Sequence, residues 1–348
     1  HDVLNITGST IPGYDELDQD FTSAILDEAG KIARDVLTPL NASGDAEGCT
    51  LENGVVRTPT GFDEAFKVMK DGGWTAMDCD PEYGGQGLPY VMNSAAQEAF
   101  VSANMAFNMY QGLTHGAYSA IHAHGTDAQK QEWLTKTRAG KAISAFALTE
   151  PQSGSDVANS TMSATLDGDH YVLNGDKTWI SNGGIADVYT VFARTGDGPG
   201  ARGLSAFIVP ADTPGLSVKE RLETIAPHPL ATLRFEDCRI PKGALIGTSG
   251  DGFKIAMSVL DVFRSTVAAA ALGFARRALD EALNRCTLRE VQGAPLFELQ
   301  MVQGHIADMA LDVDAAALLV YRAAWTKDSG APRVTREAAM AKLFATDQ

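Results

Sequence analysis

The hydrophobic period of this chain changes twice, and these changes restrict its possible folds more than any other feature. Apolar residues recur at helical spacing through most of the first 140 residues, as in segment 19–38. Short β-branched and aromatic runs bounded by turn residues then follow, for example Val188 to Ala193. From Gly250 the helical period returns in two long stripes. We therefore predict a multidomain α+β protein with a helical domain (1–142), a β domain (143–248) and a second helical domain (249–348).

Breakers and caps set the expected helix boundaries of the first domain. The helix over residues 19–38 should end at Pro39, because proline interrupts a continuing helix. Residues 41–59 are rich in Gly, Asp, Asn and Thr and predict a long surface loop. Further helices are expected over about 91–102, 109–123 and 127–137, the last with Asp127 as its N-cap.

Charge and composition narrow the functional class. The chain of 348 residues is 45% hydrophobic and 21% charged, as an ordinary globular protein is. Its net charge of −16, without a Lys/Arg cluster, argues against nucleic acid or an anionic membrane surface as a partner. The longest apolar stretch, 267–274, is flanked by Arg264 and Arg276, so we expect no membrane-spanning segment.

The four cysteines, spaced far apart without a CxxC pair or a neighbouring His cluster, fit a reducing cytosol and predict no metal site. His115, His122 and His124 share one helical segment, and ordinary polar contacts are the favoured interpretation over a metal. The chain starts at His1 without a Met or a signal peptide, and its last helical pattern stops at Gln348 without a cap. We expect the sequence to be truncated at both ends.

The usual marks of several enzyme classes are absent from the sequence. There is no GxGxxG after a strand, no GxxxxGK[ST], no HExxH and no GxSxG. Nicotinamide Rossmann enzymes, phosphate-loop NTPases, zinc peptidases and nucleophile-elbow hydrolases are therefore disfavoured.

Two neighbouring motifs carry the candidate chemistry. Residues 146–156 (FALTEPQSGSD) end a predicted strand and enter a turn whose N–H groups and hydroxyls could bind a polar heterocycle edge or an anion. A turn that caps its own backbone is the alternative. In residues 177–184 (KTWISNGG), strand alternation predicts Trp179 and Ser181 on one face, able to stack on and bond a flat ring. The alternative is that the Trp179 side chain is simply buried in the hydrophobic core.

Together with FEDCRIP and GDGFKIAMSVLD, these motifs make the chain resemble the acyl-CoA dehydrogenase family from about Tyr83 to its end. The resemblance implies an N-terminal helical domain, a central β-barrel-like domain and a C-terminal helical bundle, here apparently truncated. It also implies FAD, an acyl-CoA substrate, an electron-transfer flavoprotein as acceptor and a homotetramer or homodimer in bacterial cytoplasm.

The same resemblance assigns roles to individual residues. Phe146, Leu148 and Thr149 would lie beside the flavin ring, Trp179 would pack on it, and Ser181 would bond near N5. Ser155 matches a serine that contacts flavin phosphate or CoA. Asp261, Phe263 and Arg264 would lie near the substrate, with Arg264 supporting catalysis. Arg289 and Gln300 match residues that hold the neighbouring subunit's FAD, although Val291 and Gln292 depart from the family pattern between them.

The implied reaction is α,β-dehydrogenation of an acyl-CoA to a trans-2-enoyl-CoA, with hydride transfer to flavin N5 and the α-proton passing to a Glu. Phe263 stands where some branches carry this base, and a phenyl ring accepts no proton. We therefore expect the base beyond Gln348. An acyl-CoA oxidase, a flavin monooxygenase and a catalytically silent acyl-CoA-binding protein are the alternatives.

Substrate identity stays open because the two parts of the chain resemble different subgroups. Several segments of the first 145 residues are similar to 3-methylthiopropanoyl-CoA dehydrogenases, namely HDVLN, LTPLNASGDAEGC, CDPEYGGQGLP, SANMAFNMY and GLTHGA. The remainder is similar to short-chain, medium-chain or cyclic acyl-CoA dehydrogenases. Segment 224–233 (TIAPHPLATL) is unusual, since many members carry a Ser- and Thr-rich flavin-side loop there.

Overall fold

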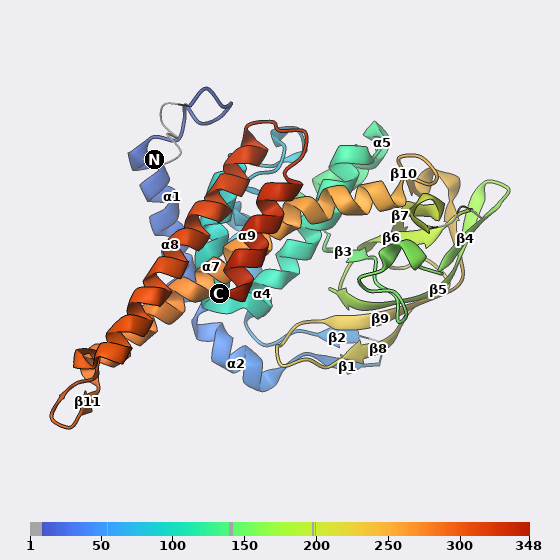
Figure 1. Ribbon diagram of the computed structural model, residues 1–348. Helices are drawn as coiled ribbons and strands as arrows, with labels where there is room; N and C mark the ends of the chain where they lie inside the picture. Colours follow the sequence, from blue (N-terminus) through green and yellow to red (C-terminus); the bar gives the residue numbers. More distant parts are fainter. Residues whose placement is uncertain (1–8, 54, 139–141, 197, 199) are drawn as a thin grey trace. The chain divides into compact units, whose positions relative to one another are not determined.

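The computed structural model (Figure 1) describes residues 9–53, 55–138, 142–196, 198 and 200–348. The HDVLN motif lies outside these residues. Contacts divide the chain into two compact units, and each is described by itself. The helical unit comprises His1–Thr38, Gly87–Met105 and Asp261–Gln348, and the β unit comprises Pro39–Gln86 and Ala106–Leu260.

The two units do not correspond to consecutive segments of the chain such as the three predicted domains. The boundary between the units falls within two long helices. One is α4 (Tyr90–His124), divided after Met105, and the other is α7 (Gly252–Leu288), divided after Leu260. We expected two helices in place of α4, and the backbone of Asn104 is indeed non-helical, with φ −158° and ψ 91°. The boundaries 1–142, 143–248 and 249–348 stay a prediction of sequence domains.

The helical unit begins with α1 (Gln19–Ile32), whose N-cap Asp18 accepts a hydrogen bond from the Phe21 N–H. A π-helical turn, η2 (Ala33–Leu37), continues it, and the Leu37 carbonyl accepts from the Asn104 side chain. The unit also contains β11 (Glu290–Val291), β12 (Ala294–Pro295), η9 (Leu296–Glu298), α8 (Gln300–Asp328) and α9 (Thr335–Asp347).

Small side chains dominate the core of the helical unit and let its helices approach closely. Asp328, at the end of α8, accepts hydrogen bonds from the Tyr90 and Val91 N–H groups and so caps the start of α4. The core cluster consists of Ala268, Ala269, Leu272, Val313, Ala316, Val320, Ala323 and Ala341.

Helix α7 is long and apolar enough to cross a membrane by length and composition alone, with a window of mean hydropathy 1.6. Core helices of water-soluble proteins pass the same test. The side chains of Ala268, Ala269 and Leu272 on this helix are fully buried in the core described above. The expected absence of a membrane-spanning segment stays a prediction.

The first stretch of the β unit corrects the predicted loop over residues 41–59. Helix α2 (Pro39–Glu47) starts at Pro39, and β1 (Thr50–Glu52) pairs with β2 (Val55–Arg57) in an antiparallel hairpin. A proline fits the first turn of a helix, because the N–H that it lacks has no partner there. The helix expected over residues 19–38 does end before Pro39, at Leu37, and Pro39 itself starts the next helix. Helix α3 (Phe62–Asp71) follows the hairpin.

Shorter helical pieces join α3 and α4 to the sheet. The predicted helix 127–137 is present as α5 (Asp127–Gln129), η5 (Lys130–Leu134) and α6 (Thr135–Arg138). Its N-cap is Thr126, not Asp127, because the Thr126 hydroxyl and the Gln129 side chain form a capping box. The short 3-10 helices of the unit are η3 (Trp74–Ala76), η4 (Pro81–Tyr83), η6 (Val157–Asn159), η7 (Gly200–Gly203) and η8 (Lys242–Ala244).

An eight-stranded sheet forms the rest of the β unit, in the order β10-β7-β6-β4-β5-β9-β8 with β3 paired to β6. The β3–β6 pairing is parallel, and β6 and β7 are buried along almost their whole length. The strands are β3 (Ser144–Ala147), β4 (Ser163–Asp167), β5 (His170–Ser181), β6 (Val188–Arg194), β7 (Leu204–Pro210), β8 (Leu216–Leu222), β9 (Leu230–Pro241) and β10 (Leu245–Ile246).

Candidate functional site

The segment after β3 forms the turn that the first motif predicts. Phe146 is buried, and its ring lies 4.8 Å from that of Phe192 on β6. Leu148 is buried and Thr149 half-buried, and a short bridge between Glu150 and Ser153 closes the turn. The Thr149 carbonyl accepts a hydrogen bond of 2.9 Å from the Thr178 N–H, which places the turn directly beside Trp179.

A buried ion pair between Lys177 and Glu150 stabilises this turn. The Lys177 ammonium lies 2.8 Å from the Glu150 carboxylate and donates to the Leu148 carbonyl at 2.9 Å. Both charged side chains are almost completely buried. Burial raises the pKa of Glu150, but Lys177 and the N–H groups of Thr161 and Met162 outweigh it and hold that pKa below its usual range. Glu150 therefore stays ionised, and Lys177 fixes the Leu148–Thr149 peptide.

Trp179 does not follow the strand geometry on which its prediction rested. The register of β5 against β9 shifts between Lys177 and Ile180, and Trp179 has φ +57°. At such a bulge, side chains do not alternate strictly, so period two cannot place Trp179 and Ser181 on one face. The indole is 58% exposed, which rules out the alternative of a core Trp. A bulky residue at positive φ is strained, and such strain concentrates at functional sites.

The neighbouring polar residues differ in exposure. Ser181 is half-buried at the end of β5, and Ser155 is exposed in the turn after Ser153. Asn182 is completely buried, and its side-chain amide donates to the carbonyls of Tyr110 and Ser144. Asn182 thus ties the end of β5 to the start of β3.

The groups around Thr149 fit one edge of an isoalloxazine ring. Among the described residues, neither the backbone N–H nor the hydroxyl of Thr149 has a hydrogen-bond partner. Half-buried polar groups of this kind gain free energy when a ligand bonds to them. The exposed indole of Trp179, one residue from the Thr178–Thr149 hydrogen bond, offers an apolar surface for the flat ring.

Three of the four predicted substrate residues lie together on α7 in the helical unit, whereas Ser155 belongs to the β unit. Asp261 and Arg264 form an ion pair one helical turn apart, and the Thr335 hydroxyl at the start of α9 donates to Asp261. Their side chains are 21% and 36% exposed. Phe263, between them, is half-buried. Asp261 and Arg264 thus form an ion pair along the helix surface, and their substrate contacts stay a prediction.

Arg289 and Gln300 flank the β11–β12 hairpin. Both residues are exposed, and the Arg289 carbonyl closes the hairpin by accepting from the Leu296 N–H at 2.7 Å. Gln292 and Gly293 form its turn with φ of 55° and 84°. Exposed side chains at the base of a protruding hairpin are placed where another subunit could meet them, and their contact with a neighbour's FAD stays a prediction.

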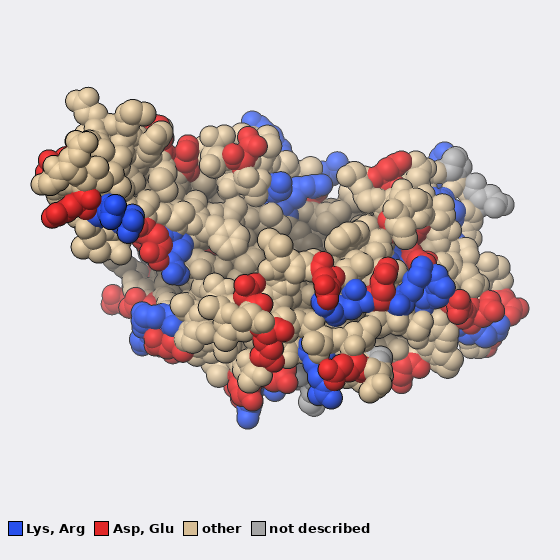
Figure 2. Space-filling view, turned by 90° about the horizontal axis from the view of Figure 1, so that it is seen from below, with Lys and Arg blue, Asp and Glu red and all other residues tan. Residues whose placement is uncertain are grey.

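The surface charge is mixed in sign. On the face shown in Figure 2, blue basic side chains alternate with red acidic ones. Within the β unit, Asp176 pairs with both Arg234 and Lys219. The expected absence of a nucleic-acid partner stays a prediction.

The arrangement of a helical unit, an eight-stranded β unit and a flavin-fitting turn defines a flavin-dependent oxidoreductase class. Family models of the acyl-CoA dehydrogenase N-terminal, middle and C-terminal domains match residues 20–141, 145–238 and 250–348. The chain belongs to the acyl-CoA dehydrogenase family. The predicted recognition and the fold of N-terminal helical, middle β and C-terminal helical domains are therefore confirmed.

Similar proteins of known type agree with this family assignment. The chain is 43% identical over 288 residues to human mitochondrial short-chain specific acyl-CoA dehydrogenase, covering 81% of this chain and 70% of that protein. The butyryl-CoA dehydrogenase structure from Megasphaera elsdenii matches with a TM-score of 0.87 and 33% identity, over 95% of this chain and 85% of that one.

The structure of PigA in complex with FAD matches with a TM-score of 0.86 and 27% identity, over 95% of this chain and 84% of that one. The protein is thus an oxidoreductase that acts on acyl-CoA, and FAD is its cofactor.

Sequence reasoning missed the role of two charged residues in the flavin-side turn. Glu150 and Lys177 belong to the quoted motifs, but we assigned neither to the site. No local signal indicated their pairing, because the two residues are 27 positions apart and a lysine in a strand is ordinarily exposed.

Proposed function

We propose that this protein dehydrogenates an acyl-CoA thioester to a trans-2-enoyl-CoA, using FAD bound at the turn of Leu148 and Thr149. The observation that carries the proposal concerns Thr149, whose backbone N–H and hydroxyl have no hydrogen-bond partner in the described part of the chain and lie beside the exposed Trp179. Bound FAD supplies the acceptor for a hydride from the β-carbon of the substrate. The names of the similar human and Megasphaera proteins favour a short-chain acyl group as the first substrate to test.

The residues of this chain bind and orient the reactants. Lys177 holds the Leu148 carbonyl, and the Thr178 N–H holds the Thr149 carbonyl, so the Thr149 N–H is fixed toward a ligand. Arg264 and Asp261 form an ion pair on α7 near the bound substrate, and Phe263 lines the pocket for the acyl group. The α-proton passes to a Glu that the family resemblance places beyond Gln348.

The proposal includes further assignments that rest on family resemblance. Ser181 bonds near flavin N5, Ser155 contacts the flavin phosphate or CoA, and Arg289 and Gln300 reach the FAD of a neighbouring subunit. The protein acts as a homotetramer or homodimer in bacterial cytoplasm and passes its electrons to an electron-transfer flavoprotein.

Anaerobic titration of the FAD-loaded protein with a panel of acyl-CoAs tests this function. Loss of the oxidised-flavin absorbance on adding butyryl-CoA or another thioester is expected. Binding of every thioester without bleaching would contradict dehydrogenation and favour a silent acyl-CoA-binding protein. Peroxide formed stoichiometrically in air would favour an oxidase, and an oxygenated product would favour a monooxygenase.

The flavin contact of Trp179 has a test of its own. Trp179→Ala removes the proposed stacking surface, so the dissociation constant of FAD should rise roughly tenfold. The matched control is Trp133→Ala, whose indole lies in the same unit under the Lys136 ammonium at 4.5 Å. An equal effect of the two variants, measured by fluorescence of free FAD, would show that Trp179 has no special role at the flavin.

A further inference from the structure

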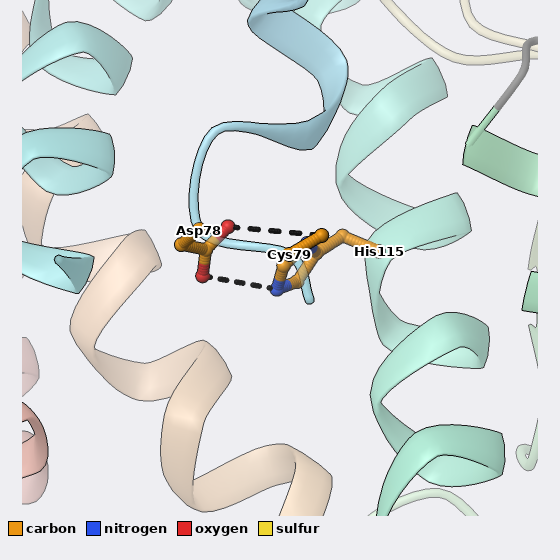
Figure 3. Close-up of side chains that lie close together, drawn as sticks. All are labelled: Asp78, Cys79 and His115. Atoms are coloured by element: carbon orange, nitrogen blue, oxygen red, sulfur yellow. Dashed lines mark hydrogen bonds and ion pairs between the residues drawn. The ribbon is translucent and has the colours of Figure 1, made fainter. Parts of the chain in front are cut away.

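Three potential metal ligands of different chemistry meet in the β unit, away from the flavin-side turn. Asp78 and Cys79 lie between η3 and η4, and His115 projects from α4 toward them (Figure 3). One ligand atom from each residue, a carboxylate oxygen, the thiol sulfur and a ring nitrogen, lies within 4.8 Å of the other two. We propose that Asp78, Cys79 and His115 form a binding site for a thiophilic divalent cation, zinc.

The distances fit a single ion of zinc size. Cys79 Sγ lies 3.7 Å from His115 Nδ1 and 4.0 Å from Asp78 Oδ1. Sulfur and nitrogen ligands of one tetrahedral zinc are about 3.5 Å apart, given metal–ligand bonds of about 2.3 and 2.0 Å. Both distances from the Cys79 sulfur are therefore within about half an ångström of this spacing. The second ring nitrogen, Nε2, lies 3.6 Å from Asp78 Oδ2, so each ring nitrogen lies near an atom of one of the other two residues.

Burial and charge favour a dication at this place. The side chains of Asp78 and His115 are 5% and 15% exposed, and Cys79 is 1% exposed. A buried carboxylate is unfavourable without a compensating positive charge. Zn²⁺ with one carboxylate, one thiolate and a neutral imidazole has no net charge. On binding, the Cys79 S–H bond breaks, its proton is released to solvent, and a zinc–sulfur bond forms, with water as the fourth ligand.

The backbone around Cys79 is held in place, so the site is preformed. The Cys79 N–H donates to the Ala76 carbonyl at 3.2 Å, and the Gly85 N–H donates to the Asp80 carbonyl at 3.0 Å. A Cβ atom on Gly85 would lie 2.0 Å from the Cys79 carbonyl oxygen, so only glycine permits this approach. A rigid ligand loop loses little conformational entropy when a metal binds.

His122, two helical turns along α4, provides an internal contrast. It pairs with Asp80 at 3.0 Å, but both side chains are well exposed, at 41% and 35%. Among the described residues, no thiol joins this pair within metal-ligand distance. His122 thus makes the ordinary polar contact that the sequence favoured for all three histidines, whereas His115 faces both a thiol and a carboxylate.

Zinc retention by the FAD-loaded protein tests the site. The protein, free of any affinity tag, is treated with chelator, desalted, exposed to zinc sulfate and desalted again before elemental analysis and thermal unfolding. We expect about one equivalent of zinc per chain and a rise in Tm of at least about 2 °C. Titration with cadmium should add an ultraviolet thiolate-to-metal band in the difference spectrum.

Matched variants show which residues hold the metal. His115→Asn and Cys79→Ala should lose the zinc, the Tm increase and the cadmium band, while His122→Asn and Cys286→Ala keep all three. The flavin spectrum and the metal-free Tm report whether each variant is folded. Absence of the cadmium band in the unaltered protein, or zinc retention by folded His115→Asn and Cys79→Ala, would overturn the proposal. Because none of these readouts needs catalysis, they are independent of the proposed dehydrogenation.

Discussion

Two ion pairs of this protein have similar chemistry and opposite surroundings. Glu150 and Lys177 in the β unit are 27 residues apart in sequence, and their side chains are 1% and 0% exposed. Asp261 and Arg264 in the helical unit are three residues apart, and their side chains are 21% and 36% exposed. The first pair joins the flavin-side turn to β5, whereas the second lies along a single helix.

The difference shows that burial, not the presence of a salt bridge, decides what such a pair contributes. Glu150 accepts from the N–H groups of Thr161 and Met162 as well as from Lys177, so its charge is fully compensated without water. The Asp261–Arg264 pair is partly hydrated, and water can replace either partner. We therefore expect the buried pair to control stability and the exposed pair to affect mainly function.

Replacing Lys177 by methionine should have the largest effect. The change leaves the Glu150 carboxylate buried with its main positive partner gone, so the free energy of unfolding should fall by about 3–5 kcal/mol. Urea unfolding followed by tryptophan fluorescence measures this loss. The Leu148 carbonyl also loses its donor, and FAD binding should weaken in the same variant.

The double variant Lys177→Met/Glu150→Gln distinguishes an uncompensated charge from a general packing defect. Removing the carboxylate should restore part of the lost stability, because a neutral amide is less costly to bury. If the double variant is less stable than Lys177→Met by the full cost of Glu150→Gln alone, the two residues are not coupled, and the comparison above fails.

His228 extends the comparison to a buried ionisable group that has no ionic partner among the residues the structure describes. The residue is 7% exposed, and its ring packs edge-on against Tyr110 at 5.3 Å. Burial lowers its pKa to about 4, although the neighbouring Ala106 backbone opposes this. Folded His228 is therefore neutral, while the unfolded residue binds a proton below about pH 6.5.

The stability contribution of neutral His228 should be complete above pH 6.5 and decline as the pH falls toward 4. Relative to His228→Gln, the unaltered protein should lose about 3 kcal/mol of unfolding free energy between about pH 7 and pH 4. Urea unfolding at several pH values measures this difference. A pH-independent difference between the two proteins would mean that His228 is hydrated or paired.

The order of domains was predictable from the sequence because long periodic segments carry a strong signal. Strand β6 lies where the run from Val188 to Ala193 placed it, and the turn after Phe146 follows a strand as expected. The family and its cofactor were also predictable, since they depend on specific motifs. The individual assignments of flavin and substrate residues remain predictions for mutagenesis.

Features that depend on contacts distant in sequence were not predictable. The loop expected over residues 41–59 contains most of α2 and a hairpin, because Pro39 starts a new helix directly after the preceding one has ended. The bulge at Trp179 arises from pairing of β5 with β9, which period two does not encode. Cys79 and His115 are 36 residues apart, so linear ligand spacing could not reveal their meeting.

The exposed pair provides the smallest expected change in stability. Arg264→Gln should lower the free energy of unfolding by less than about 1 kcal/mol, because solvent replaces the lost partner of Asp261. In the unaltered protein, 0.5 M NaCl should weaken the Asp261–Arg264 pair and leave the Glu150–Lys177 pair unchanged. The Debye length at this ionic strength is about 4 Å, and ions screen only the charges that they can reach.

In the Arg264→Gln variant, acyl-CoA-dependent bleaching of the flavin should slow by at least about tenfold if Arg264 supports the substrate site. A loss of stability equal to that of Lys177→Met would show that exposure does not separate the two pairs. Unchanged bleaching would remove Arg264 from the substrate site.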